Sequence, residues 1–494
     1  MLRSTLAATA LMLAVTTPHS AAFALEGKAL LDSFIADAAD MGVKLRYETL
    51  SEDGSSFTMG NVVVTNARGR DIAIDQVNVQ NLQDAGSGRV SYDSIVVNGM
   101  TGPTDSGGQV AVQTIATTNG EWPVTIWRDG LTAEEKKQRI RFGSFTVNGV
   151  AVKDKGANTT LDTLSVLEAD IPLDYRYDPQ SAKLTEPVAG PLRVKGFSIS
   201  GLGGTAQGDV SWSIGGITLA DLNMPTAMSA FTADTIRTYS GVSLTDIAFK
   251  MAGLDVFSIA SISGAISEPS DDGTLTGTSN MSGLYANLKA ITDPQSRAVF
   301  EQLGYETVEG SLTGVGSYNP DTGFADVSQM TLTLTDMFDL DFTYAMQGYT
   351  LDVIRKLNEA SLSIESGTPI MEAYGAILPE LANLKLSDLK LSLKDRSLTG
   401  RALDFQASQM GTTGDQLAQG APMMIGMGMA GLQMPGLTDM VTRAVGDFLR
   451  DKGTLNVEAK PAEPVSLINL ILTGQSNPTR IPEMLNLQVS ATPQ

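Results

Sequence analysis

The chain has no cysteine, and its single histidine, His19, lies near the start of the sequence. If that segment is removed after export, neither imidazole nor thiol remains in the mature chain. This excludes a cysteine nucleophile, a histidine-based triad and most zinc or haem ligand sets. We therefore expect no enzyme activity, no catalytic residue, no resident metal and no cofactor.

The chain has no long uninterrupted apolar run, and its first apolar run, Leu6–Val15, is short. Arg3 precedes this run, and Ala22-Phe23-Ala24 follows it as an A-x-A cleavage site. The run is about half of the roughly twenty residues that a spanning helix needs. The pattern predicts a cleaved signal peptide over 1–24, no transmembrane segment in the mature chain and, most simply, a periplasmic location.

Positive charge is also scarce: 34 Lys and Arg stand against 55 Asp and Glu, a formal net charge of -21. Such a chain repels nucleic acid and anionic lipid headgroups, so nucleic-acid binding is not expected. Aromatic residues make up 6% of the chain, too few for extended sugar-stacking platforms. A carboxylate-based hydrolase needs no histidine and stays open as a minor alternative. The 42% share of hydrophobic residues is ample for a packed core.

In most of the remaining sequence, apolar and polar residues alternate with period two, as they do in half-buried strands. An opening helix is predicted over 27–41 and a second one over 294–303, after Asp293 as cap. Strands are predicted at Met59–Thr65, Ile72–Val79, Val90–Val97 and Ile140–Val147, and a three-stranded hairpin region over 311–348 around Asn319-Pro320-Asp321-Thr322-Gly323. Asn-Gly or Ser-Gly pairs recur at Gly99, Gly149, Gly201 and Gly264, where they suggest strand ends and turns.

The last third has a different pattern. The leucines at 384 and 386 and those at 389, 391 and 393 alternate in two phases, as at a bulge. Residues 397–452 have helical spacing, and strands are expected at Leu455–Ala459 and Leu485–Val489. The fold class predicted is α+β and β-rich: a long curved antiparallel meander with helices packed on it and a more helical C-terminal third. We expect regions at 25–190, 191–350 and 351–494.

Two strings resemble catalytic motifs without their context. Gly426–Gly431 matches the G-x-G-x-x-G of dinucleotide sites, but no strand precedes it. Ser387–Lys390 matches the S-x-x-K of penicillin-binding enzymes, but its surroundings alternate like a strand. Acidic pairs such as Asp271-Asp272 lie in evident turns, where Asp is favoured for local hydrogen bonding.

The segment Ala421–Gly436 is unusual because it combines many methionines with glycines. Three interpretations stay open: flexible core packing, contact with a lipid or another apolar ligand, and a Cu(I) site. The candidate ligand-contact residues are Met423, Met424, Met427, Met429 and Met434.

The segment Leu391–Leu398, running into an Ala- and Gln-rich helix through Gly411, follows a signal peptide, an opening helix and glycine-punctuated strands. This style of sequence resembles poorly characterised alphaproteobacterial exported proteins, and distantly the AsmA-type and YdgA-type envelope proteins. The resemblance implies long curved antiparallel sheets and, for the AsmA type, outer-membrane assembly or lipid handling. It carries no functional residue over to this chain.

Two function classes follow. The first is a non-catalytic periplasmic protein that binds an apolar ligand, such as a lipid, in a sheet groove closed by the methionine-rich segment. The second is a structural or interaction protein of the cell envelope, which meets a protein partner through an exposed sheet edge or its acidic surface.

Overall fold

A computed structural model of the chain describes residues 43–493 except 67, 87, 124–131, 133, 135–136, 174–176, 179–182, 185–189, 207–208, 225–235, 292, 376, 430 and 432–433. Before residue 43 it describes Ala29, Leu31, Asp32, Ile35 and Ala39 alone, and all five are helical. The predicted signal peptide, with His19, lies outside the described residues. The predicted opening helix agrees with the structure at the five described positions.

The chain divides into two compact units. Unit 1 comprises residues 1–230 and 235–254, and unit 2 comprises 231–234 and 255–494. The predicted region limits fall inside these units. The limit at 190/191 precedes a strand of unit 1, and the limit at 350/351 is the start of a helix in unit 2.

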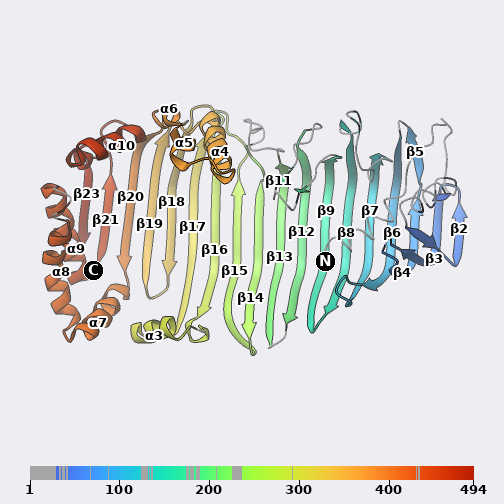
Figure 1. The fold of residues 1–494 in the computed structure, drawn as a ribbon, viewed down its shortest axis with the longest axis horizontal. Helices are drawn as coiled ribbons and strands as arrows, with labels where there is room; N and C mark the ends of the chain where they lie inside the picture. The colour runs from blue at the N-terminus through green and yellow to red at the C-terminus, as the bar shows by residue number, and fades with distance from the viewer. Residues whose placement is uncertain are drawn as a thin grey trace. The chain divides into compact units, whose positions relative to one another are not determined.

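Unit 1 is built on an antiparallel sheet whose strands follow one another in chain order with short connections (Figure 1). Both β1 and β2 pair with β3, and β5 pairs with β6 beside β4. The strands are β1 (Lys44–Arg46), β2 (Thr49–Asp53), β3 (Ser56–Thr65), β4 (Asp71–Gln80), β5 (Gln83–Gly86), β6 (Arg89–Pro103), β7 (Gln109–Pro123), β8 (Arg139–Asp154), β9 (Ala157–Pro172), β12 (Leu192–Ala206), β13 (Val210–Met224) and β14 (Gly241–Met251); β10 (Tyr177–Asp178) and β11 (Lys183–Leu184) form a separate pair.

The four strands expected from alternation are confirmed within β3, β4, β6 and β8. The β-branched residues in these runs suit a pleated, half-buried surface. Their apolar side chains form the core of unit 1, in which Val62 is fully buried and Ile74, Val77, Val112 and Ile115 are 2–3% exposed. Leu31 of the opening segment belongs to the same cluster.

The predicted role of the Asn-Gly and Ser-Gly pairs as strand ends is wrong. Gly99, Gly149 and Gly201 lie inside β6, β8 and β12, each with a left-handed backbone (φ 67°, 62° and 61°). They belong to one row of positions across the sheet, where Asn61 and Asp246 adopt the same conformation. Only Gly, Asn and Asp adopt this region at low cost.

This row shifts the side-chain alternation of each strand by one residue. In β6 the side chains of Val97 and Met100 are both buried although they are three residues apart, because Gly99 lies between them. A spacing of about fifty residues between the glycines is therefore the length of one two-stranded repeat of the meander. Gly264 is different, since it is an ordinary paired position of β15 in unit 2.

Unit 2 contains a second antiparallel set of strands, again in chain order, and the helices of the C-terminal third (Figure 1). The strands are β15 (Leu254–Ile266), β16 (Leu275–Asn287), β17 (Thr307–Asn319), β18 (Phe324–Leu334), β19 (Phe338–Gln347), β20 (Lys385–Asp395), β21 (Thr454–Ala459), β22 (Val465–Ser466) and β23 (Leu487–Thr492). The helices are η3 (Leu288–Ala290), α3 (Pro294–Leu303), α4 (Leu351–Glu365), α5 (Ile370–Gly375), α6 (Leu378–Leu381), α7 (Leu398–Met410), α8 (Gly414–Met429), α9 (Pro435–Asp451), α10 (Leu467–Ser476), η5 (Pro478–Arg480) and α11 (Ile481–Met484).

The expected hairpin over 311–348 is confirmed as β17, β18 and β19, and the helix after Asp293 is α3. The Asp293 side chain accepts a hydrogen bond from the backbone N–H of Ser296, as a helix cap does. The phase slip among the leucines is also confirmed. Opposite the pair Ala345 and Met346 of β19, strand β20 has one extra residue, Ser387.

The prediction of a β-rich antiparallel fold with a helical C-terminal third is confirmed in these coarse terms. The expected packing of helices on the sheet is more limited. In Figure 1, α3 and α7 lie at one end of the unit 2 strands, and α4, α5, α6 and α10 lie at the other. Helix α9 packs along the edge strand β23, and α8 packs on α9 and α7. Among the described helices, none is long and apolar enough to cross a membrane.

Candidate ligand-binding site

An apolar row crosses nine neighbouring strands of unit 1, from β3 to β14. Directly paired residues of antiparallel strands point to the same face of a sheet, so the register identifies the row's members. They are Met59, Val77, Val97, Ile115, Val147, Leu164, Ile199, Ile217 and Leu244.

The neighbouring rows extend the same face. One of them contains Phe145, Val166, Phe197, Leu219 and Val242, and other printed pairs on this face are Val150 with Leu161, Leu202 with Ile214, and Trp212 with Phe249. Phe145, Val147 and Val150 pack against the core cluster of unit 1, which places them on the same face as that core. From β8 to β14 these rows contain no charged side chain.

The opposite face of the same strands is polar. A polar row lies beside the long apolar row, one position earlier in β8. Its members are Thr146, Ser165, Ser198, Thr218 and Ser243. Their hydroxyl groups bond across strands, as between Thr218 and Ser243 at 2.7 Å. Along these rows, the sheet of unit 1 therefore has hydrocarbon on one face and hydroxyl groups on the other.

Burial changes along the apolar row. Met59, Val77, Val97 and Ile115 are 2–4% exposed, whereas Val147, Leu164, Ile199, Ile217 and Leu244 are only half-buried. Strands β8, β9, β12 and β13 make their main contacts within the described structure with their two neighbours in the sheet. The apolar face thus continues from a covered core onto a surface that the described residues cover only in part.

The candidate methionines divide between two places in unit 2. Met423, Met424 and Met427 lie on α8 and are 73%, 50% and 65% exposed, which rules out core packing for these side chains. Met429 is half-buried at the end of α8. Met434 lies farther on, at the start of α9. The contacts of α8 are with α7 and α9, so the structure gives the methionine-rich helix the position of an outer helix beside the sheet edge.

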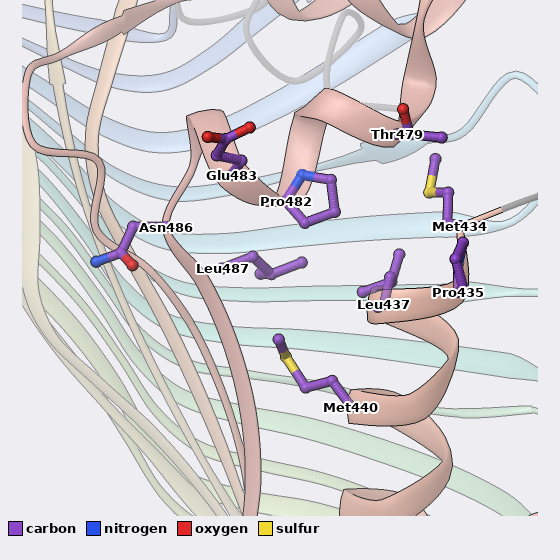
Figure 2. Close-up of a pocket in the computed structure, with 10 residues that line it drawn as sticks. Met434, Pro435, Leu437, Met440, Thr479, Pro482, Glu483, Asn486 and Leu487 are labelled. Atoms are coloured by element: carbon purple, nitrogen blue, oxygen red, sulfur yellow. The ribbon is translucent and has the colours of Figure 1, made fainter.

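Met434 lines a cleft of about 540 Å³ between the first turns of α9 and the segment that leads into β23 (Figure 2). The rest of its apolar wall consists of Pro435, Leu437, Met440, Pro482 and Leu487. Its polar groups come from Thr479, Glu483 and Asn486. Its volume is that of a small-molecule site. It is a second candidate site, and one of its lining residues, Met434, was a candidate from sequence.

In the part of the chain that the structure describes, the carboxyl groups with displaced pKa values serve turns, caps and ion pairs. A hydrogen bond from Ser270 lowers the pKa of Asp272, which lies in a turn, and a bond from Ser296 lowers that of the cap Asp293. Arg70 lowers the pKa of Asp105, and Lys356 lowers that of Glu380. A general acid needs the opposite shift, so these four groups give a hydrolase no support.

Neither motif-like string lies in the structural context that its catalytic motif needs, as expected from the sequence. Ser387 and Lys390 lie in strand β20, not one turn apart on a helix. Gly426 and Gly428 lie inside helix α8, so they form no loop between a strand and a helix.

A family model described only as an uncharacterized protein matches residues 331–492, which run from β18 to β23 and include α8 and the cleft. No curated protein matches the chain.

Sequence reasoning expected strand residues to line a groove but did not name them. The apolar rows could not be read by simple alternation, because the left-handed positions shift the phase of each strand. The signal was nevertheless in the sequence. Aligning the strands on Gly99, Gly149 and Gly201 brings Val97, Val147 and Ile199 into one row.

Proposed function

We propose that the chain binds an apolar ligand, the acyl chains of a lipid, on the half-buried apolar face of β8, β9, β12, β13 and β14. The observation that carries this proposal is the row from Val147 to Leu244, which continues a buried core row onto a partly covered surface. Burial of this surface by hydrocarbon is favourable at about 25 cal/mol per Å².

The size of the face supports a ligand. Five strands spaced about 4.8 Å apart, with apolar positions along roughly 40 Å of strand, have a footprint on the order of 1,000 Å², part of which their half-buried side chains leave exposed. The largest apolar patch of an ordinary monomer is roughly 300–600 Å². Patches of that size are often functional, and the footprint of this face is large enough to hold one.

The chemistry of the face favours hydrocarbon over a protein partner. Protein interfaces form about one hydrogen bond per 100–200 Å². The apolar rows of β8 to β14 supply side chains such as Phe145, Leu164, Ile199 and Ile217, which neither donate nor accept hydrogen bonds. An acyl chain needs no such groups, so it suits this face without leaving polar atoms unpaired.

We place this function outside the cytoplasm, in the periplasm, on the strength of the signal-like segment Arg3 to Ala24, and regard it as binding without catalysis. The alternative is an envelope interaction protein that uses a sheet edge or its acidic surface, and the edges give it less support. The edge strand β23 is covered by α9, while β1 and β2 are short and carry charged residues, as protected edges do.

The test uses two double variants on opposite faces of the same strand, β12. Phe197→Ser with Ile199→Ser alters the apolar face, and Ser198→Ala with Ser200→Ala is the matched control on the polar face. Binding of a fluorescent fatty acid is measured after circular dichroism has shown that both variants fold. We expect at least a tenfold loss of affinity in the first variant and none in the control.

Equal binding by the two variants would place the ligand elsewhere. Lipid extraction and mass spectrometry of the purified chain provide an independent readout, in which we expect a co-purified acyl lipid. A chain that binds no fatty acid and instead forms a dimer abolished by the first variant would overturn the proposal in favour of self-association.

A further inference from the structure

The methionine side chains are the soft metal ligands of this protein. The chain has no cysteine, its one histidine lies within the first 24 residues, and it has 21 methionines. Soft sulfur ligands select Cu(I) over the harder divalent ions. A soft cation therefore meets thioether sulfur here without competition from thiolate, and the question is where several thioethers gather at an accessible surface.

The outer face of α8 is such a place. Met423 and Met427 are four residues apart, and Met424 and Met427 are three apart, so each pair lies on adjacent turns of one helix face. This spacing puts Cβ atoms about 5–6 Å apart, within reach of convergence for three flexible side chains. All three are at least half exposed, at 73%, 50% and 65%.

The inner side of α8 is packed, so the face that carries Met423, Met424 and Met427 points outward. Ala418 and Ala421 are buried on its inner side, and Pro422 lies against Gly446 of α9. Gly420 and Gly428, beside the methionines, have open space where a Cβ atom would lie. These two positions therefore leave room beside the exposed thioethers, where a cation can approach from solvent.

Charge supports a cation as the occupant. The chain has a formal net charge of -21, which raises the local concentration of cations near its surface. Helix α8 carries no Lys or Arg, and its one charged residue, Asp415 in the first turn, pairs with Lys452 at 3.8 Å. Three apolar side chains held in water at the outer face are costly to leave unpartnered, and a soft metal ion gives them a partner that water does not.

We propose that Met423, Met424 and Met427 form a three-thioether site for Cu(I) on the outer face of α8. This site is separate from the apolar face of unit 1, and neither proposal depends on the other. The binding step involves no electron transfer, since the ion enters and leaves as Cu(I).

The test uses Ag(I), a soft monovalent cation that does not change its redox state, followed by Cu(I) under anaerobic conditions. With methyl-labelled methionine, we expect Ag(I) to shift the methyl resonances of the three residues together and to saturate at one equivalent. Competition with a coloured Cu(I) chelator then gives the affinity of the site.

The variant Met423→Leu/Met424→Leu/Met427→Leu keeps side-chain volume and apolar character and removes the sulfur. We expect it to lose the bound equivalent. The control is Met330→Leu/Met410→Leu, which removes two other exposed thioethers, 37% and 59% exposed, and should retain it. Full stoichiometry in the triple variant, or an equal loss in the control, would overturn the site.

Oxidation offers a test without substitution. Hydrogen peroxide transfers one oxygen atom to each thioether, giving a sulfoxide and water, and the sulfoxide is a harder, oxygen-bearing group. Once mass spectrometry shows sulfoxide at the three positions, Ag(I) binding should fall at least tenfold and return after enzymatic reduction of the sulfoxides. Unchanged binding by the oxidised chain contradicts the proposal.

Discussion

Pro422 of α8 lies directly against Gly446 of α9: a Cβ atom at position 446 would be 2.7 Å from the Cγ atom of Pro422. The two helices therefore approach each other as closely as a glycine allows. Helix α9 in turn covers the sheet edge, where the backbone N–H of Val489 in β23 donates a hydrogen bond to the Sδ atom of Met440 at 3.1 Å. An uncovered edge strand is a template for pairing with another chain.

Replacement of Gly446 should weaken the cover that α9 gives to the edge strand β23. In Gly446→Val, the added side chain meets Pro422, so α8 and α9 must separate, and α9 loses the helix that supports it on β23. We expect faster self-association on mild heating, measured by light scattering with size-exclusion chromatography. The control is Gly428→Ala, where the Cβ atom has open space and alanine is the better helix former by roughly 1 kcal/mol. Equal association rates for the two variants would show that α9 does not protect the edge.

The left-handed row of unit 1 gives a second prediction. At Gly99, φ is +67° and a Cβ atom would lie 1.9 Å from the Oδ2 atom of Asp75. We expect Gly99→Ala to lower the free energy of unfolding by roughly 1–2 kcal/mol from the backbone conformation alone. Gly196→Ala, at ordinary contact distance from Leu167 and without positive φ, should have little effect.

Tryptophan fluorescence during urea unfolding measures both variants, because Trp122, Trp127 and Trp212 all belong to unit 1. A Gly99→Ala midpoint equal to that of Gly196→Ala would mean that the row tolerates an ordinary β residue. The left-handed row would then not be required for the shift in side-chain alternation along the strands.

The row also explains which parts of the fold could be predicted from sequence. Local alternation was enough to place β3, β4, β6 and β8, because two or three repeats of the apolar–polar pattern fit between left-handed positions. The same glycines were misread as strand ends, because Asn-Gly has the chemistry of a turn whether or not the chain reverses there. What distinguishes Gly149 is its partner across the sheet, Gln113, and that contact is not local.

The candidate site was predictable to a lesser degree. The methionine-rich segment was recognised by composition, but exposure separates Met423 and Met427 from Met434, and exposure depends on how α8 packs against α9. The apolar rows of unit 1 arise from pairing between residues far apart in the chain, such as Leu164 with Ile199 and Trp212 with Phe249. Sequence alternation gives each strand a face, and only the register shows that Val147, Leu164 and Ile199 share one.

Tyr92 makes the stability of unit 1 dependent on alkaline pH. Burial raises the pKa of its phenol well above the usual value, although the hydrogen bond with Thr117 at 2.9 Å acts against this shift. A raised pKa in the folded state gives stability that is complete below about pH 10 and is lost as pH rises, because the unfolded chain ionises first.

We therefore expect the urea midpoint of unit 1, followed by tryptophan fluorescence, to fall as pH rises above about 10. Tyr92→Phe should be less stable at neutral pH by roughly 0.5–1.5 kcal/mol, the worth of one hydrogen bond, and should show a shallower decline above pH 10. A parallel decline in both proteins would assign the pH dependence to other groups.

The last prediction compares two isoleucines of the same apolar row. Ile115 is 3% exposed in the core of unit 1, and Ile199 is half-buried on the part of the face proposed to bind acyl chains. Because a fully buried isoleucine leaves a cavity when truncated, Ile115→Ala should cost about 2–5 kcal/mol. Ile199→Ala removes surface that still meets water, so we expect a cost of roughly 1 kcal/mol. Urea unfolding of both variants, freed of lipid by extraction, measures the difference. Equal costs would mean that the face at Ile199 is covered as completely as the core, which would leave no room there for a ligand.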